Sequence, residues 1–382
     1  MKASAATRFE CSEQDTFELF RFPRRRRELL QAWDAADRYL LRELHAMGPK
    51  KPQRSLVVND AFGALTLGLR QDVPDVWLDD VLAELSLQEN YQHNFGEPYG
   101  GQMIPSTQQP GGPYERVVMK VPRDHDYFMS QLVGLRDAIH DRTTILAGLM
   151  AKDLHGKLLE RINGVGLTVE CSLAWKKARI LRIQAPKGWQ PSLIAASSFR
   201  LPEFGIEVRS FPGVFSGKKP DVGGRLLADV IPQNRRGMIV DCGCGNGMVA
   251  AVAAQKNPDA HILAVDVSRV AVASAEMTFH SNDLLREDHR FRAGDCLEGV
   301  EDDCAHLILC NPPFHQGQAL DSGIADRMFA GARRVLKKDG EFYVVGNRHL
   351  QYHVKLKRYF SQVELVGKHP KFVRFKCRLP VR

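Results

Sequence analysis

The segment MIVDCGCGNG, residues 238–247, decides the fold. Its apolar residues are typical of a buried strand, which runs into a turn containing Gly243, Gly245 and Gly247, and a helix is expected to begin near Met248. Glycines at this spacing remove side chains where the backbone turns sharply and approaches a ligand. Strand, glycine-rich turn and helix in this order predict a Rossmann-like α/β sheet with a ligand at the carboxyl ends of its strands.

An acidic residue at the end of this strand, Asp241, distinguishes the turn from one that binds a dinucleotide. A carboxylate there would repel a pyrophosphate but attract a cation, such as a sulfonium that also carries an ammonium group. Asp266 ends the next strand, where an acid hydrogen-bonds ribose hydroxyls, and Asp295 follows the third, where it can meet an adenine amine. Each acid alone could be a helix cap, but three at successive strand ends converge on one crevice. We therefore expect S-adenosylmethionine as cofactor, bound by Asp241, Gly243, Gly245, Asn246, Gly247, Asp266, Asp295 and Asn311.

The tetrapeptide NPPF, residues 311–314, follows the fourth expected strand, at 306–309. Its prolines lack N–H donors and stiffen the turn, which leaves carbonyls free to accept. The Asn311 side-chain oxygen and the Pro312 carbonyl can accept the two N–H groups of an exocyclic base amine and orient its lone pair, while Phe314 can stack on the base. We expect catalysis by Asn311, Pro312, Pro313 and Phe314, with no metal. A proline-rich β-turn without catalytic role is the alternative, and His315 is expected to shape the turn rather than act as a base.

The two halves of the chain read as degenerate copies of one another. Residues 57–63 (VVNDAFG) align with 239–245 (IVDCGCG), and 118–122 (VMKVP) align with 309–313 (LCNPP), in the same order. The first copy keeps one of the three loop glycines and has Lys120 where the second has Asn311. We expect two tandem Rossmann-like class I methyltransferase domains: a degenerate, RNA-docking one at 1–190 and a catalytic one at 198–382. Lys120 would then offer a cation to a phosphate, and apolar spacing predicts a helix over 28–44.

The composition suits two domains with well-buried cores, since 44% of the 382 residues are hydrophobic. A formal net charge of +8 tolerates a polyanionic partner without identifying one. No run approaches the ~20 apolar residues that cross a bilayer, and the N-terminus lacks an apolar signal core. We expect a cytoplasmic monomer that does not bind membranes. The eight cysteines lack paired metal-ligand spacing, which predicts reduced thiols rather than disulfides or a zinc site.

Basic residues gather at equivalent places in the two copies. Residues 348–382 hold ten Lys or Arg against one acid, Glu364, and a shorter cluster lies at 176–182. Phosphate contacts with RNA are the functional interpretation, and a solvated helix and edge-strand surface is the alternative. The residues expected to contact RNA are Lys176, Lys177, Arg179, Arg348, Lys371 and Arg374.

The sequence resembles the bacterial ribosomal RNA guanine-N2 methyltransferases with a duplicated domain. The large-subunit branch fits better than the small-subunit one, through LQAWDAAD at 30–37, VNDAFGAL at 58–65 and LAWKKAR at 173–179. NRHL at 347–350 also resembles this family, and the likeness covers nearly the whole chain beyond its first ~25 residues.

This resemblance implies an inactive first domain and an active second one that methylates the exocyclic N2 of a guanine in 23S ribosomal RNA. It also implies that residues 214–225 pack over the methionine end of the cofactor. Several alternatives stay open: a small-subunit 16S guanine, N6 of adenine or a protein glutamine as substrate, or a ribosome-assembly factor without catalysis. NPPF is shared with amine methylases of adenine and glutamine, so the tetrapeptide alone does not name guanine.

Overall fold

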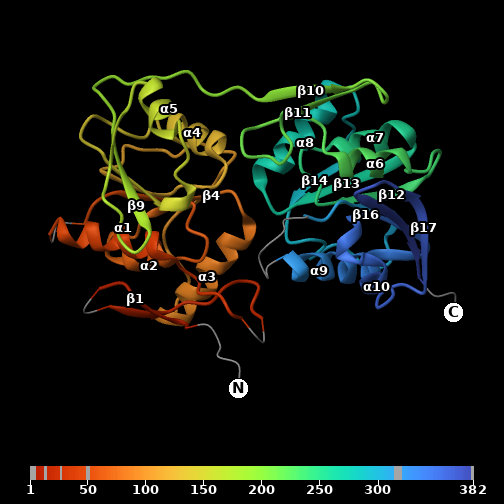
Figure 1. The fold of residues 1–382 in the computed structure, drawn as a ribbon, viewed down its shortest axis with the longest axis horizontal. Coiled ribbons are helices and arrows are strands. Elements are labelled where there is room, and N and C mark those ends of the chain that lie inside the picture. The colour runs from red at the N-terminus through yellow and green to blue at the C-terminus, as the bar shows by residue number, and fades with distance from the viewer. Residues whose placement is uncertain (1–5, 13–14, 26–27, 49–51, 314–320, 380–382) are drawn as a thin grey trace. The chain divides into compact units, whose positions relative to one another are not determined.

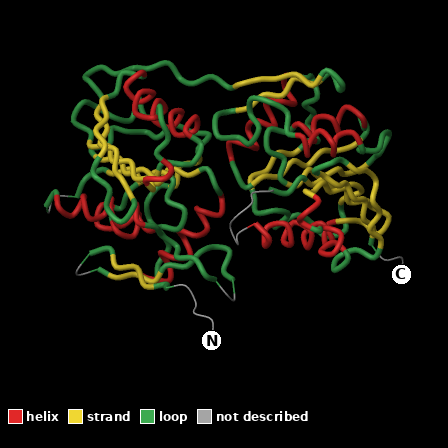
Figure 2. The backbone as a smooth tube through the Cα atoms, in the orientation of Figure 1, coloured by secondary structure: helices red, strands yellow, loops and turns green. Residues whose placement is uncertain are grey.

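The computed structural model describes residues 6–12, 15–25, 28–48, 52–313 and 321–379. For residues 321 and 322 it describes the backbone only. It divides into two compact units, Met1–Ile194 and Ala195–Arg382. In each, helices lie on both faces of a central sheet, so each is a three-layer α/β unit (Figure 2). The division falls between the expected domains at 1–190 and 198–382, whose separate roles remain predictions.

The second unit is built on a seven-stranded sheet in the order β14-β13-β12-β15-β16-β18-β17. The first five of these strands are parallel, and β18 and β17 are antiparallel additions. The strands are β12 (Gly237–Cys242), β13 (Ala260–Asp266), β14 (Arg290–Ala293), β15 (Ala305–Cys310), β16 (Leu336–Asn347), β17 (Gln362–Lys368) and β18 (Phe372–Arg378). Because the chain proceeds outward from β12 in one direction and returns to its other side as β15, the strand order reverses there. Ligands of open α/β sheets bind at such a reversal.

Two sets of helices cover this sheet (Figure 1). One face carries α6 (Val222–Asp229), α7 (Met248–Lys256), α8 (Arg269–Ser281) and the ribbon of β10 (Ser197–Leu201) with β11 (Ile206–Ser210), packed in one apolar core. The other face carries α9 (Asp321–Val335) and α10 (Tyr352–Leu356), which bury Phe329 and Leu356 against the sheet. The predicted strand that runs into the glycine-rich turn and the one predicted at 306–309 are confirmed as β12 and β15.

The first unit repeats the same sheet, in the order β5-β4-β3-β6-β7-β9-β8. Again five strands are parallel and the last two antiparallel, so the predicted duplication of an α/β domain is confirmed. The strands are β3 (Ser55–Val58), β4 (Asp75–Leu78), β5 (Met103–Pro105), β6 (Arg116–Lys120), β7 (Thr144–Met150), β8 (Thr168–Cys171) and β9 (Ala178–Gln184). The other elements are β1 (Arg8–Glu10), β2 (Thr16–Glu18), α1 (Ala35–Ala46), α2 (Ala64–Gly68), α3 (Val81–Phe95), α4 (His125–Gly134) and α5 (Leu158–Gly164), with short 3-10 turns at Arg70–Asp72, Ala151–Asp153 and, in the second unit, Arg348–Leu350.

The helix predicted over 28–44 begins later, at Ala35. Asp34 caps it through the backbone N–H groups of Ala36 and Asp37, and Asp37 accepts from the Asp34 N–H in return. Such a capping box fixes a helix start more strongly than apolar spacing does. Leu29 and Leu30, which suggested the earlier start, are 61% and 39% exposed.

The described ranges lack both a bilayer-spanning helix and a metal-binding cluster of side chains. None of the helices there combines the length and apolar character needed to cross a bilayer. No cluster of three or more His, Cys, Asp or Glu side chains suited to a metal ion occurs among the described residues, and the cysteines there are free thiols.

Candidate active site

The glycine-rich turn after β12 folds back onto the end of β13. Gly243, Gly245 and Gly247 all lie at positive φ. A Cβ at Gly247 would stand 2.6 Å from the Ala275 Cα of α8, so only glycine fits where α7 begins. The Gly245 N–H donates to Asp266 Oδ2 at 2.9 Å. The turn therefore connects the carboxyl ends of two neighbouring strands, β12 and β13.

Asp241 is a buried carboxyl at the centre of this edge. It is 2% exposed, and its Oδ2 finds no hydrogen-bond partner among the described residues. The pKa of Asp241 is raised to about 7, mainly by burial; a backbone hydrogen bond from Ala250 opposes the rise, and the nearby Asp266 adds to it. A buried carboxylate without compensation is costly, and a cation nearby would favour its charged form. The residues at this edge thus fit a positively charged cofactor.

Asp295, after β14, has a partner that its sequence position did not suggest. Its Oδ2 forms an ion pair with Arg327 of α9. Both residues line a cavity of about 220 Å³ between the loop after β14 and α9. The carboxylate expected to meet an adenine amine is therefore already shared with a guanidinium, and its contact with adenine remains a prediction.

Asn246 is directed at the protein rather than outward. It is 6% exposed, and its amide donates to the Ser216 carbonyl at 3.4 Å. The backbone carbonyl of Asn246 accepts from the Thr278 hydroxyl of α8 at 2.8 Å. Asn246 thus holds the segment before α6 against the glycine-rich turn, and its contact with the cofactor remains a prediction.

The described part of the tetrapeptide lies directly after β15. The Asn311 Nδ2 donates to Asp221 Oδ2 at 2.8 Å, and Asn311 Oδ1 is buried with no partner within the described ranges. Pro312 is buried and Pro313 is exposed. Phe314 and His315 lie outside the described residues. A side-chain acceptor, Asn311 Oδ1, is therefore left without a partner among the described residues at the carboxyl end of β15, close to the switch point of the sheet.

Asp221 is a site residue that sequence reasoning missed. It was included only in the segment 214–225, without a role of its own. Its signal was an aspartate at the start of an amphipathic helix, which ordinarily indicates no more than an N-cap.

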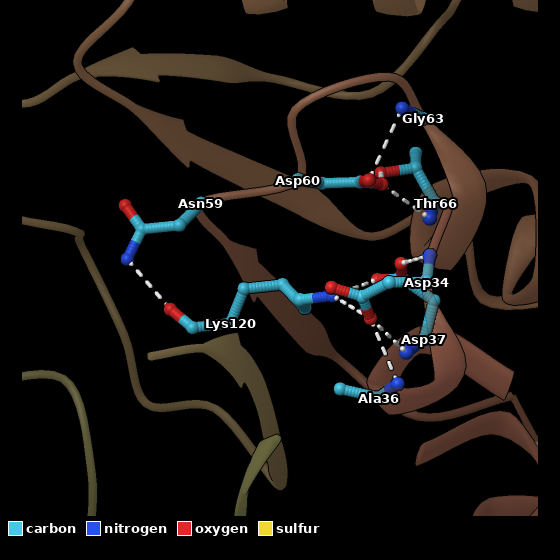
Figure 3. A network of polar contacts seen from close by, with 8 residues as sticks. All are labelled: Asp34, Ala36, Asp37, Asn59, Asp60, Gly63, Thr66 and Lys120. Carbon is cyan, nitrogen blue, oxygen red and sulfur yellow. Dashed lines mark hydrogen bonds and ion pairs between the residues drawn. The ribbon is translucent and has the colours of Figure 1, made fainter. Parts of the chain in front are cut away.

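The equivalent edge of the first unit is closed by its own side chains (Figure 3). The Lys120 ammonium lies 2.6 Å from Asp34 Oδ1 and 2.8 Å from Asp37 Oδ1. Burial alone would lower the pKa of Lys120, but the two carboxylates outweigh it and raise that pKa. Lys120 is thus neutralised inside the fold, and the prediction that it offers a free cation to a phosphate is wrong.

The remaining positions of this closed edge are also paired. Asn59, aligned with Asp241, donates to the Lys120 carbonyl at 2.9 Å and exchanges hydrogen bonds with Gln131 at 2.8 Å. Asp60 accepts from the Gly63 and Thr66 backbone N–H groups and from the Thr66 hydroxyl (Figure 3). The polar atoms that the second unit leaves available are satisfied internally in the first.

The basic clusters occupy equivalent hairpins of the two sheets. In the first unit the Lys177 carbonyl accepts from the Ala151 N–H at 2.7 Å, and in the second the Lys371 carbonyl accepts from the Arg348 N–H at 3.1 Å. Each contact joins the tip of the last hairpin to the end of the neighbouring parallel strand. The side chains of Lys176, Lys177, Arg348 and Lys371 are exposed there.

The other two predicted RNA contacts are less available. Arg179 donates to the Ser172 carbonyl at 2.8 Å and is partly buried. The Arg374 side chain is 14% exposed and donates to the Leu226 carbonyl at 3.1 Å. This inward direction argues against a phosphate contact for Arg374, which instead ties β18 to α6.

The doubly wound sheet, its glycine-rich turn and the acceptor left after β15 define the class of S-adenosylmethionine-dependent methyltransferases. A family model described as Methyltransferase small domain matches residues 205–376, and one described as RLMG N-terminal domain matches residues 7–187. Proteins named ribosomal RNA large subunit methyltransferase G are similar to this chain over almost its whole length. The Shewanella sp. protein is 38% identical, and the match covers 93% of this chain and 95% of the Shewanella protein. The Pseudomonas fluorescens protein is 39% identical, and the match covers 94% of this chain and 97% of the Pseudomonas protein. The chain belongs to the ribosomal RNA large subunit methyltransferase G family, which confirms the resemblance found in the sequence.

A solved structure has the same two-unit fold. The 16S rRNA N2 methyltransferase of T. thermophilus, in complex with AdoMet and guanosine, superimposes with a TM-score of 0.76 over 98% of both chains. At 21% sequence identity this likeness establishes the fold alone and does not identify the substrate of this chain.

Proposed function

We propose that the chain transfers a methyl group from S-adenosylmethionine to the exocyclic N2 of a guanine in large-subunit, 23S ribosomal RNA. The observation that carries the proposal is the acceptor left at Asn311 Oδ1, at the carboxyl end of β15. An exocyclic amine has two N–H donors and a lone pair delocalised into the ring. Two acceptors, Asn311 Oδ1 and the Pro312 carbonyl, suit both donors and direct the lone pair at the methyl group.

The chain's own groups do the positioning. Asp241 and Asp266 favour a cation at the glycine-rich turn, and Asn246 holds residues before α6 against that turn. S-adenosylmethionine, when bound, supplies a methyl carbon already activated by its sulfonium. The amine proton can leave to water after transfer, so no protein base is required.

Two considerations favour this substrate over the alternatives. The relatives named for large-subunit RNA cover nearly the whole chain, whereas the 16S enzyme supports the fold alone. A non-catalytic assembly factor would have no need of a buried Asp241 whose Oδ2 lacks a partner among the described residues, and the first unit closes the same edge with internal pairs. Adenine N6 and protein glutamine present the same kind of amine, so the experiment below must separate them from guanine.

RNA docking by the first unit and by both hairpin tips belongs to the same proposal. Lys176 and Lys177, and separately Arg348 and Lys371, present exposed cations at corresponding places of two similar sheets. Phosphate contacts from such cations position RNA without reading its sequence. The expected monomeric state and cytoplasmic location remain predictions.

The proposal is tested by nucleoside mass spectrometry on ribosomal RNA from a strain that lacks this gene. Large-subunit RNA should lose one N2-methylguanosine, and the native gene should restore it. A gene carrying Asn311→Ala should fail to restore it, while Asn163→Ala, a control at an exposed asparagine of α5, should succeed. A loss confined to small-subunit RNA, to N6-methyladenosine or to no nucleoside would contradict the proposal.

A further inference from the structure

The first turn of α6 is connected to the tetrapeptide by a single carboxylate oxygen. Asp221, the N-cap of α6, accepts from the Gly224 N–H at 2.7 Å through Oδ2. The same oxygen accepts from Asn311 Nδ2 at 2.8 Å. A side chain 90 positions upstream thus occupies one face of the Asn311 amide.

Packing independent of this contact holds the start of α6 in place. A Cβ at Gly224 would stand 2.4 Å from Met248 Cε and 3.7 Å from Asn311 Nδ2, so the first turn of α6 packs closely against the Met248 side chain and the tetrapeptide. Leu227 and Ala228 of α6 are fully buried, and Arg225 forms an ion pair with Glu203 at 2.6 Å. Asp221 therefore projects from a fixed backbone, and the Asn311 side chain adjusts to it.

The chemistry of the pair decides which way the amide faces. A carboxylate can only accept hydrogen bonds, so the NH₂ group of Asn311 must turn toward Asp221. The flipped amide would set its carbonyl oxygen against the carboxylate and direct N–H donors at the substrate. With Asp221 in place, Oδ1 is the atom left for the substrate within the part of the chain that the structure describes.

We propose that Asp221 is a positioning residue that holds the NH₂ group of Asn311 and thereby directs Asn311 Oδ1 at the substrate. The site then selects a substrate that presents an amine N–H donor at the reacting position. This inference rests on the proposed function and adds to it the group that orients the amide. Without Asp221 the amide can turn its donors to a substrate that also donates, and we expect the correct orientation to fall to roughly 1–10% of the population. A misoriented reacting group of this kind lowers a catalysed rate by roughly 10- to 100-fold.

The test uses variants of the full chain that separate helix capping from positioning. Asp221→Ser keeps a cap acceptor for the Gly224 N–H but is too short to reach Asn311. Asp221→Asn keeps the shared oxygen, which the Gly224 N–H continues to hold toward Asn311. Asp124→Ser is the matched control, because Asp124 caps α4 of the first unit through the Asp126 and Tyr127 N–H groups and lies in no proposed site.

Each variant is assayed by single-turnover transfer from labelled S-adenosylmethionine to protein-free large-subunit RNA of the deletion strain, with cofactor Kd by calorimetry and Tm alongside. Asp221→Ser should transfer roughly 10- to 100-fold more slowly with Kd and Tm close to wild type. Asp221→Asn should recover most of the rate, and Asp124→Ser should show the full rate. In an Asn311→Ala background, Asp221→Ser should slow transfer no further, because both act through one amide. If Asp221→Ser unfolds, Asp221→Gly serves in its place, since glycine is tolerated as an N-cap.

Three results would overturn the inference while leaving the proposed function intact: a wild-type rate in Asp221→Ser, an equal reduction in both backgrounds, or a weakened cofactor Kd with an unchanged rate. The last would make Asp221 a cofactor contact. An inactive wild-type chain would overturn the proposed function, and this inference with it.

Discussion

Replacing Lys120 by methionine should destabilise the first unit without weakening RNA binding. The change leaves Asp37, whose side chain is 8% exposed, next to Asp34 without their shared cation. Removing one partner of a buried ion pair typically costs about 3–5 kcal/mol. We expect the lower end, about 3 kcal/mol, because the Asp34 side chain is 46% exposed and can turn to water. For a unit of this size that corresponds to a Tm lowered by about 6–12 °C.

The assay can observe this unit alone, because all four tryptophans, Trp33, Trp77, Trp175 and Trp189, lie in it. Tryptophan fluorescence during thermal unfolding of the full chain therefore reports on the first unit. Lys187→Met, at an exposed lysine of the same unit, is the control and should leave Tm unchanged.

The destabilisation should also depend on pH. Burial raises the pKa of Asp37 to about 6, and Lys120 opposes that rise, so its removal moves the pKa higher. A carboxyl whose pKa is raised in the folded state gives its full stabilisation at low pH and loses it as pH rises through the folded value. The Lys120→Met variant should therefore be destabilised more at pH 8 than at pH 5. Normal stability combined with weaker RNA binding would refute the reasoning and return Lys120 to a phosphate-binding role.

Four further outcomes follow from the same geometry. Asn311→Ala should leave the cofactor Kd nearly unchanged while slowing transfer by ~10²-fold or more in the single-turnover assay, and a normal rate would contradict its role. Asp266→Ala should weaken S-adenosylmethionine binding by ~1.5–3 kcal/mol in calorimetry, because it removes a charged acceptor that also holds Gly245; unchanged affinity would exclude it from the site. Burial raises the pKa of Asp241 to about 7, and a bound cation lowers it, so cofactor affinity should increase from pH 5.5 to 8. Binding below pH 7 should release protons, which calorimetry detects as binding enthalpies that depend on the buffer. Affinity that is independent of pH would count against this. The double variant Lys176→Glu, Lys177→Glu should reduce the slope of log RNA affinity against log salt by about one unit for each phosphate that the hairpin no longer binds. A slope equal to that of the wild type would indicate a solvated hairpin that does not contact RNA.

The sequence was informative wherever backbone geometry demanded particular residues. Gly247 is required by its approach to α8, and the repeated order of strands follows from two similar runs of apolar segments. Acids at strand ends were predictable for the same reason, since the carboxyl ends of parallel strands meet at one edge. Fold class and the placement of Asp241, Asp266 and Asn311 at that edge could thus be derived before any coordinates.

Interactions between side chains far apart in the chain could not be derived. Asp221 meets Asn311 across 90 positions, and Asp34 meets Lys120 across 86. In sequence both aspartates look like ordinary helix caps, and they are caps, but each also has a long-range partner that only packing supplies. Lys120 was misjudged because charge is visible in a sequence whereas burial beside a carboxylate is not, and the same holds for the Leu226 carbonyl that Arg374 contacts.

Methylation of guanine N2 by this chain can be decided by one labelling measurement on purified components. The full chain is incubated with S-adenosylmethionine carrying a deuterated methyl group and with protein-free large-subunit RNA from the deletion strain, and the RNA is digested and analysed by nucleoside mass spectrometry. We predict deuterated N2-methylguanosine, approaching one per RNA molecule, and none with Asn311→Ala. Label in N6-methyladenosine, or equal labelling by wild type and Asn311→Ala, would contradict this prediction.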